Sequence, residues 1–202
     1  MVKKKEKPTR RTLKYIEYYP TPQEIHDKII HSKGWNYVNA ETRDLYVKRD
    51  RALVAILYLL ALRISEALRL RRNQFVFHED RIEVRGIKLS KSRIKDKPRK
   101  EQYRDEAYLP LKGSRVPLTK LVKEYLNNLK GNTQLFKFGR KRAWQIVVTL
   151  TGNTCHWFRA FGEDFLYEEW DHDLLAVADY VKVDPRTLQD YIRKRWKKYK
   201  AV

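Results

Sequence analysis

Ala52-Leu53-Val54-Ala55-Ile56-Leu57-Tyr58-Leu59-Leu60-Ala61-Leu62 is the longest uninterrupted apolar run of the chain, and Arg63-Ile64-Ser65-Glu66-Ala67-Leu68 follows it directly. The run is about half as long as the ~20 residues that a membrane span needs, so it predicts a buried helix. Arg63 leaves this buried segment as a cation, and a buried guanidinium needs an anionic partner. Glu66 can supply an ion pair, and the sharper alternative is that the core holds Arg63 pointing at a phosphate.

Capping and turn signals divide the rest of the chain into mostly helical segments. Thr21-Pro22-Gln23-Glu24 has the pattern of a capping box with proline at the first helical position, which predicts a helix over 22–31. The alternation over 81–85 predicts a half-buried strand, and residues 107–111 can form its antiparallel partner across a basic loop. Other helices are expected from about 49 to 62, from 64, and over 117–130, 140–150, 154–170, 173–181 and 185–199. The predicted fold class is therefore mainly α with a small antiparallel β-sheet (α+β).

The charge of the chain is concentrated in three stretches. The 202 residues contain 45 Lys and Arg against 25 Asp and Glu, a formal net charge of +20. Residues 1–15, 85–104 and 192–202 carry +6, +7 and +6 of it, and the remainder is close to neutral. This pattern indicates a globular core with basic appendages for a polyanion partner, and it excludes a disordered polycation. We expect a basic lead-in over 1–19 and a single domain with a basic C-terminal tail over 20–202.

Residue counts and missing motifs exclude several classes of site. The single cysteine, Cys155, excludes an intramolecular disulfide and a Cys-cluster zinc site, and it suits a reducing intracellular compartment. No glycine-rich phosphate loop occurs, so we expect no nucleotide cofactor. No secretory signal or membrane span is predicted, so we expect no membrane partner and a cytoplasmic location.

Two further positions are candidates for chemistry. His156 and Arg159 are three residues apart near the start of a predicted helix, so they share a face beside a helix N-terminus, which favours an anion. A solvated surface pair is the plainer interpretation. Among 13 tyrosines, Tyr191 stands in the last predicted helix immediately before the basic tail. Packing is its default role, and Tyr180 and Tyr199 are rivals for any nucleophilic role.

An acidic run interrupts this basic sequence. Carboxylates at such density can hold Mg²⁺ for a nuclease. A solvated helix face that offsets the basic patches is the simpler account. The residues of this acidic run are Glu163, Asp164, Glu168, Glu169, Asp171, His172 and Asp173.

Taken in order, these elements resemble the catalytic domain of tyrosine recombinases, the phage-integrase-like family, over about residues 20–195. Leu62-Arg63-Ile64-Ser65-Glu66-Ala67-Leu68 is nearly the family's first catalytic box, Leu-Arg-Ile-Ser-Glu-Leu. Ile87-Lys88-Leu89-Ser90-Lys91-Ser92-Arg93 resembles its hairpin-lysine segment. His156-Trp157-Phe158-Arg159 matches His-x-x-Arg, and Thr187-Leu188-Gln189-Asp190-Tyr191 corresponds to the nucleophile box.

The chain departs from the family pattern at several places. Lys182 falls nine residues before the tyrosine, where the family usually has histidine or tryptophan. Ala61 stands where glycine is common before Leu-Arg, and Ala160 replaces a usual polar residue. Most members also carry a separate helical core-binding domain that closes around DNA as a clamp, and we expect no such domain in this chain.

The resemblance implies DNA strand cleavage and rejoining without a metal or any other cofactor. Tyr191 would attack a phosphodiester, forming a 3′-phosphotyrosyl bond and releasing a 5′-hydroxyl. Arg63 and Arg159 would clamp the phosphate oxygens, with His156 and Lys182 as further donors or proton-transfer groups. Glu66 would orient Arg63 or support the helix. Lys88 would protonate the leaving oxygen, and Lys91 is the alternative.

The implied partner is double-stranded DNA, on which we expect the protein to oligomerise. Candidate DNA-binding residues are Lys91, Arg93, Lys95, Arg193, Lys194 and Arg195. The tail that holds the last three can equally dock on a neighbouring protomer. Two rival functions stay open. One is a non-catalytic DNA-binding protein on the same fold, and the other is a metal-dependent nuclease that uses the acidic run.

Overall fold

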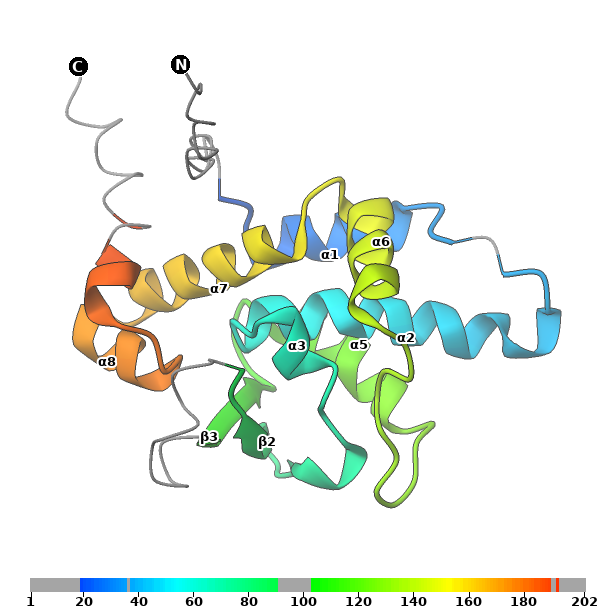
Figure 1. Ribbon diagram of the computed structural model, residues 1–202, viewed down its shortest axis with the longest axis horizontal. Helices are drawn as coiled ribbons and strands as arrows, with labels where there is room; N and C mark the ends of the chain where they lie inside the picture. The colour runs from blue at the N-terminus through cyan, green and yellow to red at the C-terminus, as the bar shows by residue number, and fades with distance from the viewer. Residues whose placement is uncertain (1–18, 36, 91–102, 190–191, 193–202) are drawn as a thin grey trace, which may run out of the picture.

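Helices make up most of the molecule and gather around one long central helix (Figure 1). The computed structural model describes residues 19–35, 37–90, 103–189 and 192. In the view of Figure 1, α7 lies above the central helix α2 and the sheet lies below it. The elements are α1 (Pro22–His31), α2 (Ala40–Leu59), α3 (Ile64–Ala67), a 3-10 turn (Arg72–Gln74), β1 (Phe75–Phe77), β2 (Arg81–Lys88), β3 (Tyr103–Pro110), α5 (Val116–Leu126), α6 (Arg140–Thr151), α7 (Cys155–Glu169) and α8 (Leu174–Tyr180).

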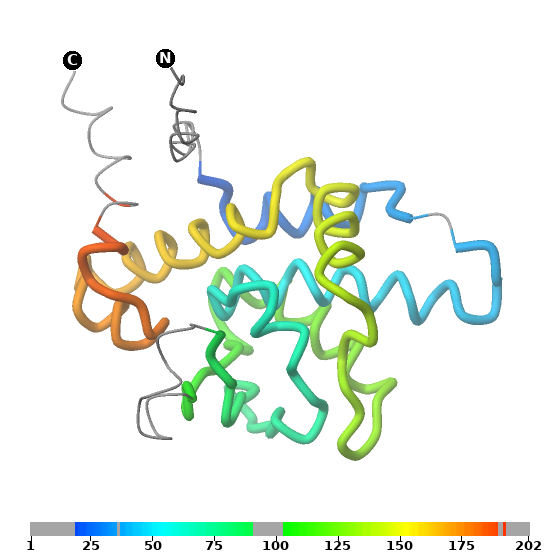
Figure 2. Tube along the Cα trace, in the orientation of Figure 1, coloured from blue at the N-terminus to red at the C-terminus, as the bar shows by residue number. Residues whose placement is uncertain are grey.

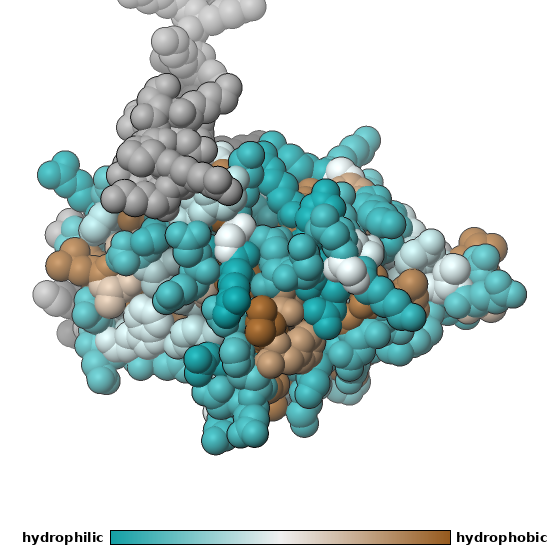
Figure 3. Space-filling model, turned by 90° about the horizontal axis from the view of Figure 1, so that it is seen from below, coloured by the Kyte–Doolittle hydropathy of each residue, from teal (hydrophilic) through white to brown (hydrophobic). Residues whose placement is uncertain are grey.

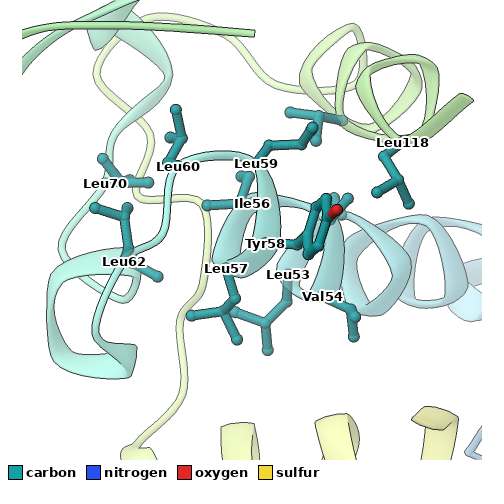
Figure 4. Packing of buried hydrophobic residues seen from close by; sticks show 14 of the residues in the cluster. Leu53, Val54, Ile56, Leu57, Tyr58, Leu59, Leu60, Leu62, Leu70 and Leu118 are labelled. Atoms are coloured by element: carbon teal, nitrogen blue, oxygen red, sulfur yellow. The ribbon is translucent and has the colours of Figure 1, made fainter. Parts of the chain in front are cut away.

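The apolar run forms the centre of the core, as predicted. No residue from Ala52 to Leu62 is more than 1 % exposed. Side chains leave α2 in several directions, and Leu118 of α5 faces them (Figure 4). A helix that is apolar all round must be covered on every side, and α2 contacts α1, α5, α6 and α7.

The predicted bounds of this helix are wrong at both ends. It begins at Ala40 rather than near Arg49, because the side chain of Asn39 caps it by accepting from the backbone of Glu41 and Thr42. It ends at Leu59 rather than at Leu62, because Ala61 adopts a left-handed conformation with φ 48°. Figure 2 follows the chain through this turn into α3.

Local signals place most other helix boundaries within one residue, but the helix predicted over 117–130 ends at Leu126. Thr21 and Glu24 form the predicted capping box, in which the Thr21 backbone donates to Glu24 Oε2 at 2.8 Å. The last predicted helix begins at Pro185 as expected, and residues 185–189 are helical. Of its predicted continuation to 199, Ile192 is described and helical, and the rest lies outside the described residues. The basic lead-in predicted over 1–19 also lies outside them, except for Tyr19.

The predicted strand pair is part of a three-stranded antiparallel sheet in the order β1-β2-β3. Ile82 pairs with Leu109 and Val84 with Ala107, and all four side chains are buried. The pairing extends to Lys88 opposite Tyr103, so the sheet is longer than predicted. The first strand, β1, was not predicted, because a three-residue strand is too short for its alternation to be recognised.

Large apolar side chains are exposed only at scattered positions on the described surface. The face in Figure 3 is mostly hydrophilic with small apolar areas. The exposed large residues are Trp35, Val38, Phe77, Trp144 and Leu175. In the described ranges, no helix has both the length and the apolar character needed to cross a membrane.

Candidate functional site

The end of α2 is held tightly against α7. A Cβ built on Gly162 would lie 2.1 Å from the Tyr58 carbonyl oxygen, so only glycine permits this approach of α7 to α2. The turn after α2 passes through Ala61, and Arg104 of β3 donates from Nη1 to the Leu60 carbonyl at 2.7 Å. These contacts fix the turn that presents Arg63 relative to α7.

Arg63 follows the turn after α2 and is the N-cap residue of α3. Its backbone N–H donates to Glu66 Oε2 at 2.8 Å and its Nη1 donates to Glu66 Oε1 at 3.0 Å. The predicted ion pair is therefore confirmed. The guanidinium is less enclosed than its place after the apolar run predicted, because the side chain is 30 % exposed.

Glu66 links several parts of the site through one buried carboxylate. Its side chain is 2 % exposed. Besides binding Arg63, Oε1 accepts from the backbone N–H of Ser90 at 3.1 Å, and Oε2 lies 3.7 Å from Arg159 Nη1. Ser90 follows Lys88 by two residues. Glu66 therefore orients Arg63, as expected, and also connects both arginines to the start of the basic loop.

His156 and Arg159 stand on the first turns of α7, as predicted. Arg159 is buried, and its Nε donates to Glu163 Oε1 at 2.6 Å. Within the described part of the chain, neither Nη atom of Arg159 has a hydrogen-bond partner. Partial desolvation and the charges of Arg159 and Arg63 hold the pKa of His156 below its usual value, so the exposed imidazole is mainly neutral at neutral pH.

A pocket of about 780 Å³ brings Arg63, His156 and Arg159 together. The interpretation of the pair on α7 as a solvated surface pair is therefore wrong for Arg159, which is 4 % exposed. A cavity whose described lining includes the buried Arg159, the partly exposed Arg63 and no acidic side chain suits an anionic ligand. Its other lining residues are Leu62, Ile64, Ser65, Arg140, Lys141, Trp144, Thr154 and Cys155.

Comparison with known proteins identifies the fold. No family model and no curated protein matches the chain. Among solved structures, the XerH site-specific recombinase bound to palindromic difH substrate, a post-cleavage complex, matches with a TM-score of 0.57 over 86 % of this chain at 19 % identity. The pre-cleavage complex of XerH with difH substrate matches with a TM-score of 0.53 over 90 % of this chain at 18 % identity. The chain has the fold of a tyrosine recombinase catalytic domain.

The recombinase fold confirms the predicted fold class and the structural side of the resemblance. The chain spans about half the length of the two XerH chains, 48 % of one and 51 % of the other.

Three pocket residues of α6 were not predicted from the sequence. Arg140 and Lys141 are exposed at the start of the helix, and Trp144 is 49 % exposed one turn further on. The basic run Arg140-Lys141-Arg142 after Gly139 was a usable signal, because it opens a predicted helix without any acidic residue in its first turn. Only the tertiary structure places that turn beside Arg63 and Arg159.

Two predicted catalytic lysines do not line the pocket. Lys88 is exposed at the end of β2. Lys182 has φ 51° and occupies the left-handed position that ends α8, where the Val183 backbone donates to the Ala178 carbonyl. Its Nζ pairs with Asp179 Oδ1 at 2.8 Å, on the surface of the recombinase fold.

The predicted nucleophile, Tyr191, lies outside the described residues. So do Tyr199 and the predicted DNA-binding residues Lys91, Arg93, Lys95, Arg193, Lys194 and Arg195. Of the rival tyrosines, Tyr180 has a packing role. Its ring stacks 3.8 Å from the Arg104 guanidinium carbon, and its hydroxyl accepts from the Tyr108 backbone at 3.3 Å.

The acidic run is dispersed by the fold. Glu163 pairs with Arg159 inside the core, and Glu169 pairs with Arg115 at 2.8 Å. In the described ranges, no three His, Cys, Asp or Glu side chains gather as a metal site requires. The fold therefore offers the nuclease hypothesis no assembled cluster in these ranges, and the view of the whole run as a solvated face is wrong for Glu163, which is 1 % exposed.

Proposed function

We propose that this protein cleaves and rejoins DNA strands through a 3′-phosphotyrosyl intermediate. The observation that carries the proposal is the position of Arg159. Its guanidinium is buried in the wall of a pocket shared with Arg63 and His156, and its two Nη groups have no hydrogen-bond partner in the described part of the chain. Buried donors without partners are costly. A phosphodiester between the two arginines would supply the acceptors.

Each residue then has a defined task. Arg63 and Arg159 bind the non-bridging oxygens, on which charge grows in the transition state. Tyr191 is the nucleophile, and the neutral imidazole of His156 can accept a proton in the pocket. Lys88, or Lys91 in its place, protonates the leaving 5′-oxygen. The phosphotyrosyl bond retains the energy of the phosphodiester, so rejoining needs no external energy source.

Duplex DNA is the proposed substrate, and several copies of the chain are expected to assemble on it. The net charge of +20 favours a polyanion, and Arg140 and Lys141 add two exposed cations to the pocket wall. Both XerH structures are DNA complexes of a site-specific recombinase. The likeness in fold supports a recombinase-type reaction for this chain.

A second candidate is a DNA-binding protein without chemistry. The observation that favours it is the placement of two expected catalytic groups. Lys182 pairs with Asp179, and neither Lys182 nor Lys88 lines the pocket. The two candidates predict the same affinity for DNA, so a covalent intermediate must separate them.

The decisive experiment uses suicide duplexes, in which a nick near the cleavage point lets the released fragment diffuse away. A broad panel of sequences is incubated with the full chain in the presence of EDTA, and a denaturation-resistant protein–DNA adduct is measured. We expect an adduct that is lost in Tyr191→Phe and kept in Tyr180→Phe and Tyr199→Phe. Binding across the panel without an adduct would establish the non-catalytic candidate. Cutting that EDTA abolishes would establish a metal-dependent nuclease.

A further inference from the structure

The carboxylate of Glu163 binds the Nε of Arg159, the predicted phosphate-binding arginine. Glu163 lies one helical turn after Arg159 on α7, and the Nε of Arg159 donates to its Oε1 at 2.6 Å. The two side chains are 5 % and 1 % exposed. This contact uses the one guanidinium nitrogen that lies within the side-chain stem. Both terminal Nη groups are left available.

We infer that Glu163 is a positioning residue that fixes Arg159 through Nε, so that both Nη groups face the phosphate. The inference rests on the proposed function, in which that phosphate belongs to DNA. Glu66 contributes from the other side, since its Oε2 lies 3.7 Å from Arg159 Nη1. That separation is too long for a hydrogen bond, so Nη1 is attracted toward Glu66 but remains able to donate to another oxygen.

The geometry explains why a carboxylate occupies this buried position. A guanidinium on a long side chain has several rotamers, and ordering it costs rotamer entropy. A buried charge-assisted hydrogen bond at Nε removes that freedom before the ligand arrives, and this is how preorganised donors assist a transition state. Burying Glu163 without Arg159 would be strongly unfavourable, so the two side chains depend on each other.

The same arrangement couples phosphate binding to a proton. Burial raises the pKa of Glu163, and Arg159 and Arg63 oppose the rise while Glu66 adds to it. The charge of Arg104, on β3, also interacts with Arg159 and Glu66. His156 is the other titrating group of the pocket. A bound phosphate adds a negative charge near Glu163 and raises its pKa again. DNA binding should therefore take up protons, and affinity should rise as pH falls through the pKa of Glu163.

Two substitutions separate positioning from simple structural support. Glu163→Gln keeps an oxygen that can accept from Nε but cannot titrate, and Glu163→Ala removes the acceptor. Glu169→Gln is the matched control, because Glu169 is on the same helix as Glu163 and also pairs with a buried arginine, Arg115. Neither Glu169 nor Arg115 lines the pocket. Urea unfolding of all three variants reports their stability separately from their function.

The first measurement is the single-turnover rate of adduct formation at saturating DNA. Glu163→Ala should slow the rate about tenfold to a hundredfold, as expected for a lost hydrogen bond between charged groups. Glu163→Gln should recover most of that loss, and Glu169→Gln should match the wild type. Equal rates in the wild type and Glu163→Ala, or no recovery in Glu163→Gln, would overturn the inference.

The second measurement is proton uptake on DNA binding, obtained at a series of pH values by calorimetry in two buffers of different ionisation enthalpy. Glu163→Gln should take up fewer protons than the wild type, and Glu169→Gln should take up the same number. Unchanged uptake in Glu163→Gln would overturn the coupling. If the wild type forms no adduct while uptake still depends on Glu163, the proposed function fails and the phosphate site remains.

Discussion

The guanidinium of Arg104, on β3, donates from Nη1 to the carbonyl oxygen of Leu60 at 2.7 Å, just beyond the end of α2. Arg104 is 1 % exposed, and within the described residues no carboxylate pairs with it. Its other face stacks on Tyr180 of α8. One buried cation therefore joins the sheet and α8 to the turn that presents Arg63.

Two substitutions of Arg104 should separate the contribution of its packing to stability from the contribution of its charge. Arg104→Ala removes the stack and the hydrogen bond and should lower the free energy of unfolding by about 2–4 kcal/mol. Arg104→Met fills similar space without a buried charge, so it should cost about 1 kcal/mol or less. Urea unfolding measures both, with the exposed Arg81→Ala as control. A loss in Arg104→Met as large as in Arg104→Ala would show that the charge itself is required.

Gly162 sets the distance between α7 and α2. Because a Cβ there would meet the Tyr58 carbonyl at 2.1 Å, Gly162→Ala must push the helices apart. We expect a loss of about 2–4 kcal/mol in unfolding free energy, and a larger fall in adduct formation than in DNA affinity, since Arg159 moves away from Arg63. Gly139→Ala is the control, because nothing lies within 4 Å of a Cβ at that position. Equal stability of Gly162→Ala and Gly139→Ala would contradict this packing.

Whether a contact of this site can be predicted depends on how far apart its two residues are in the sequence. Arg63 and Glu66 are three residues apart, and their ion pair was predicted from that spacing. Glu163 lies four residues after Arg159, so this pair was equally predictable, but the acidic residues around Glu163 favoured a solvated face. The contact of Glu66 with Ser90 and the arrival of Arg140 and Lys141 depend on tertiary packing, which no local pattern encodes.

The same distinction applies to the fold. The apolar run predicted the buried helix because burial needs only composition, but its ends depend on the Asn39 cap and on the left-handed Ala61. A glycine at position 61 would have indicated a left-handed turn in the sequence, whereas alanine gives no such signal. Lys182 likewise gives no signal for the end of α8, since it adopts φ 51° without being glycine.

Arg140 and Lys141 are predicted to bind DNA phosphates outside the chemical step. Each alanine substitution should weaken binding about equally on all sequences and lower the slope of log affinity against log salt by about 1. Fluorescence anisotropy at several salt concentrations measures the slope. Lys120→Ala, an exposed lysine of α5 that does not line the pocket, should leave the slope unchanged. A slope unchanged in Arg140→Ala and Lys141→Ala would place the DNA elsewhere.

The pH profile of cleavage should report His156. Its pKa lies below the usual 6.5 of histidine, so the imidazole is neutral at pH 7 and becomes protonated only under more acidic conditions. If neutral His156 accepts a proton, the single-turnover rate at sub-saturating DNA, which reports the free protein, should fall as pH drops through that lowered pKa. His156→Gln should be slower and lack this fall. His31→Ala, an exposed histidine of α1, should keep the wild-type profile. An acid limb that persists in His156→Gln would assign it to another group.

The choice between Lys88 and Lys91 as general acid can be made with a modified leaving group. Lys88 stands at the paired end of β2, and Ser90, two residues later, is tied to Glu66, so the backbone around Lys88 is fixed beside the arginines. This favours Lys88, although its side chain is exposed and does not line the pocket.

A 5′-bridging sulfur in the scissile linkage leaves as a thiolate and needs no proton. Lys88→Ala should therefore cleave ordinary DNA slowly, by about a hundredfold or more, and recover on the sulfur-containing duplex. Lys91→Ala should cleave both substrates at similar rates, and Arg63→Ala should be slow on both, because its loss affects the phosphate rather than the leaving group. Recovery confined to Lys91→Ala would transfer the role to Lys91. Recovery in neither lysine variant would exclude both as the general acid.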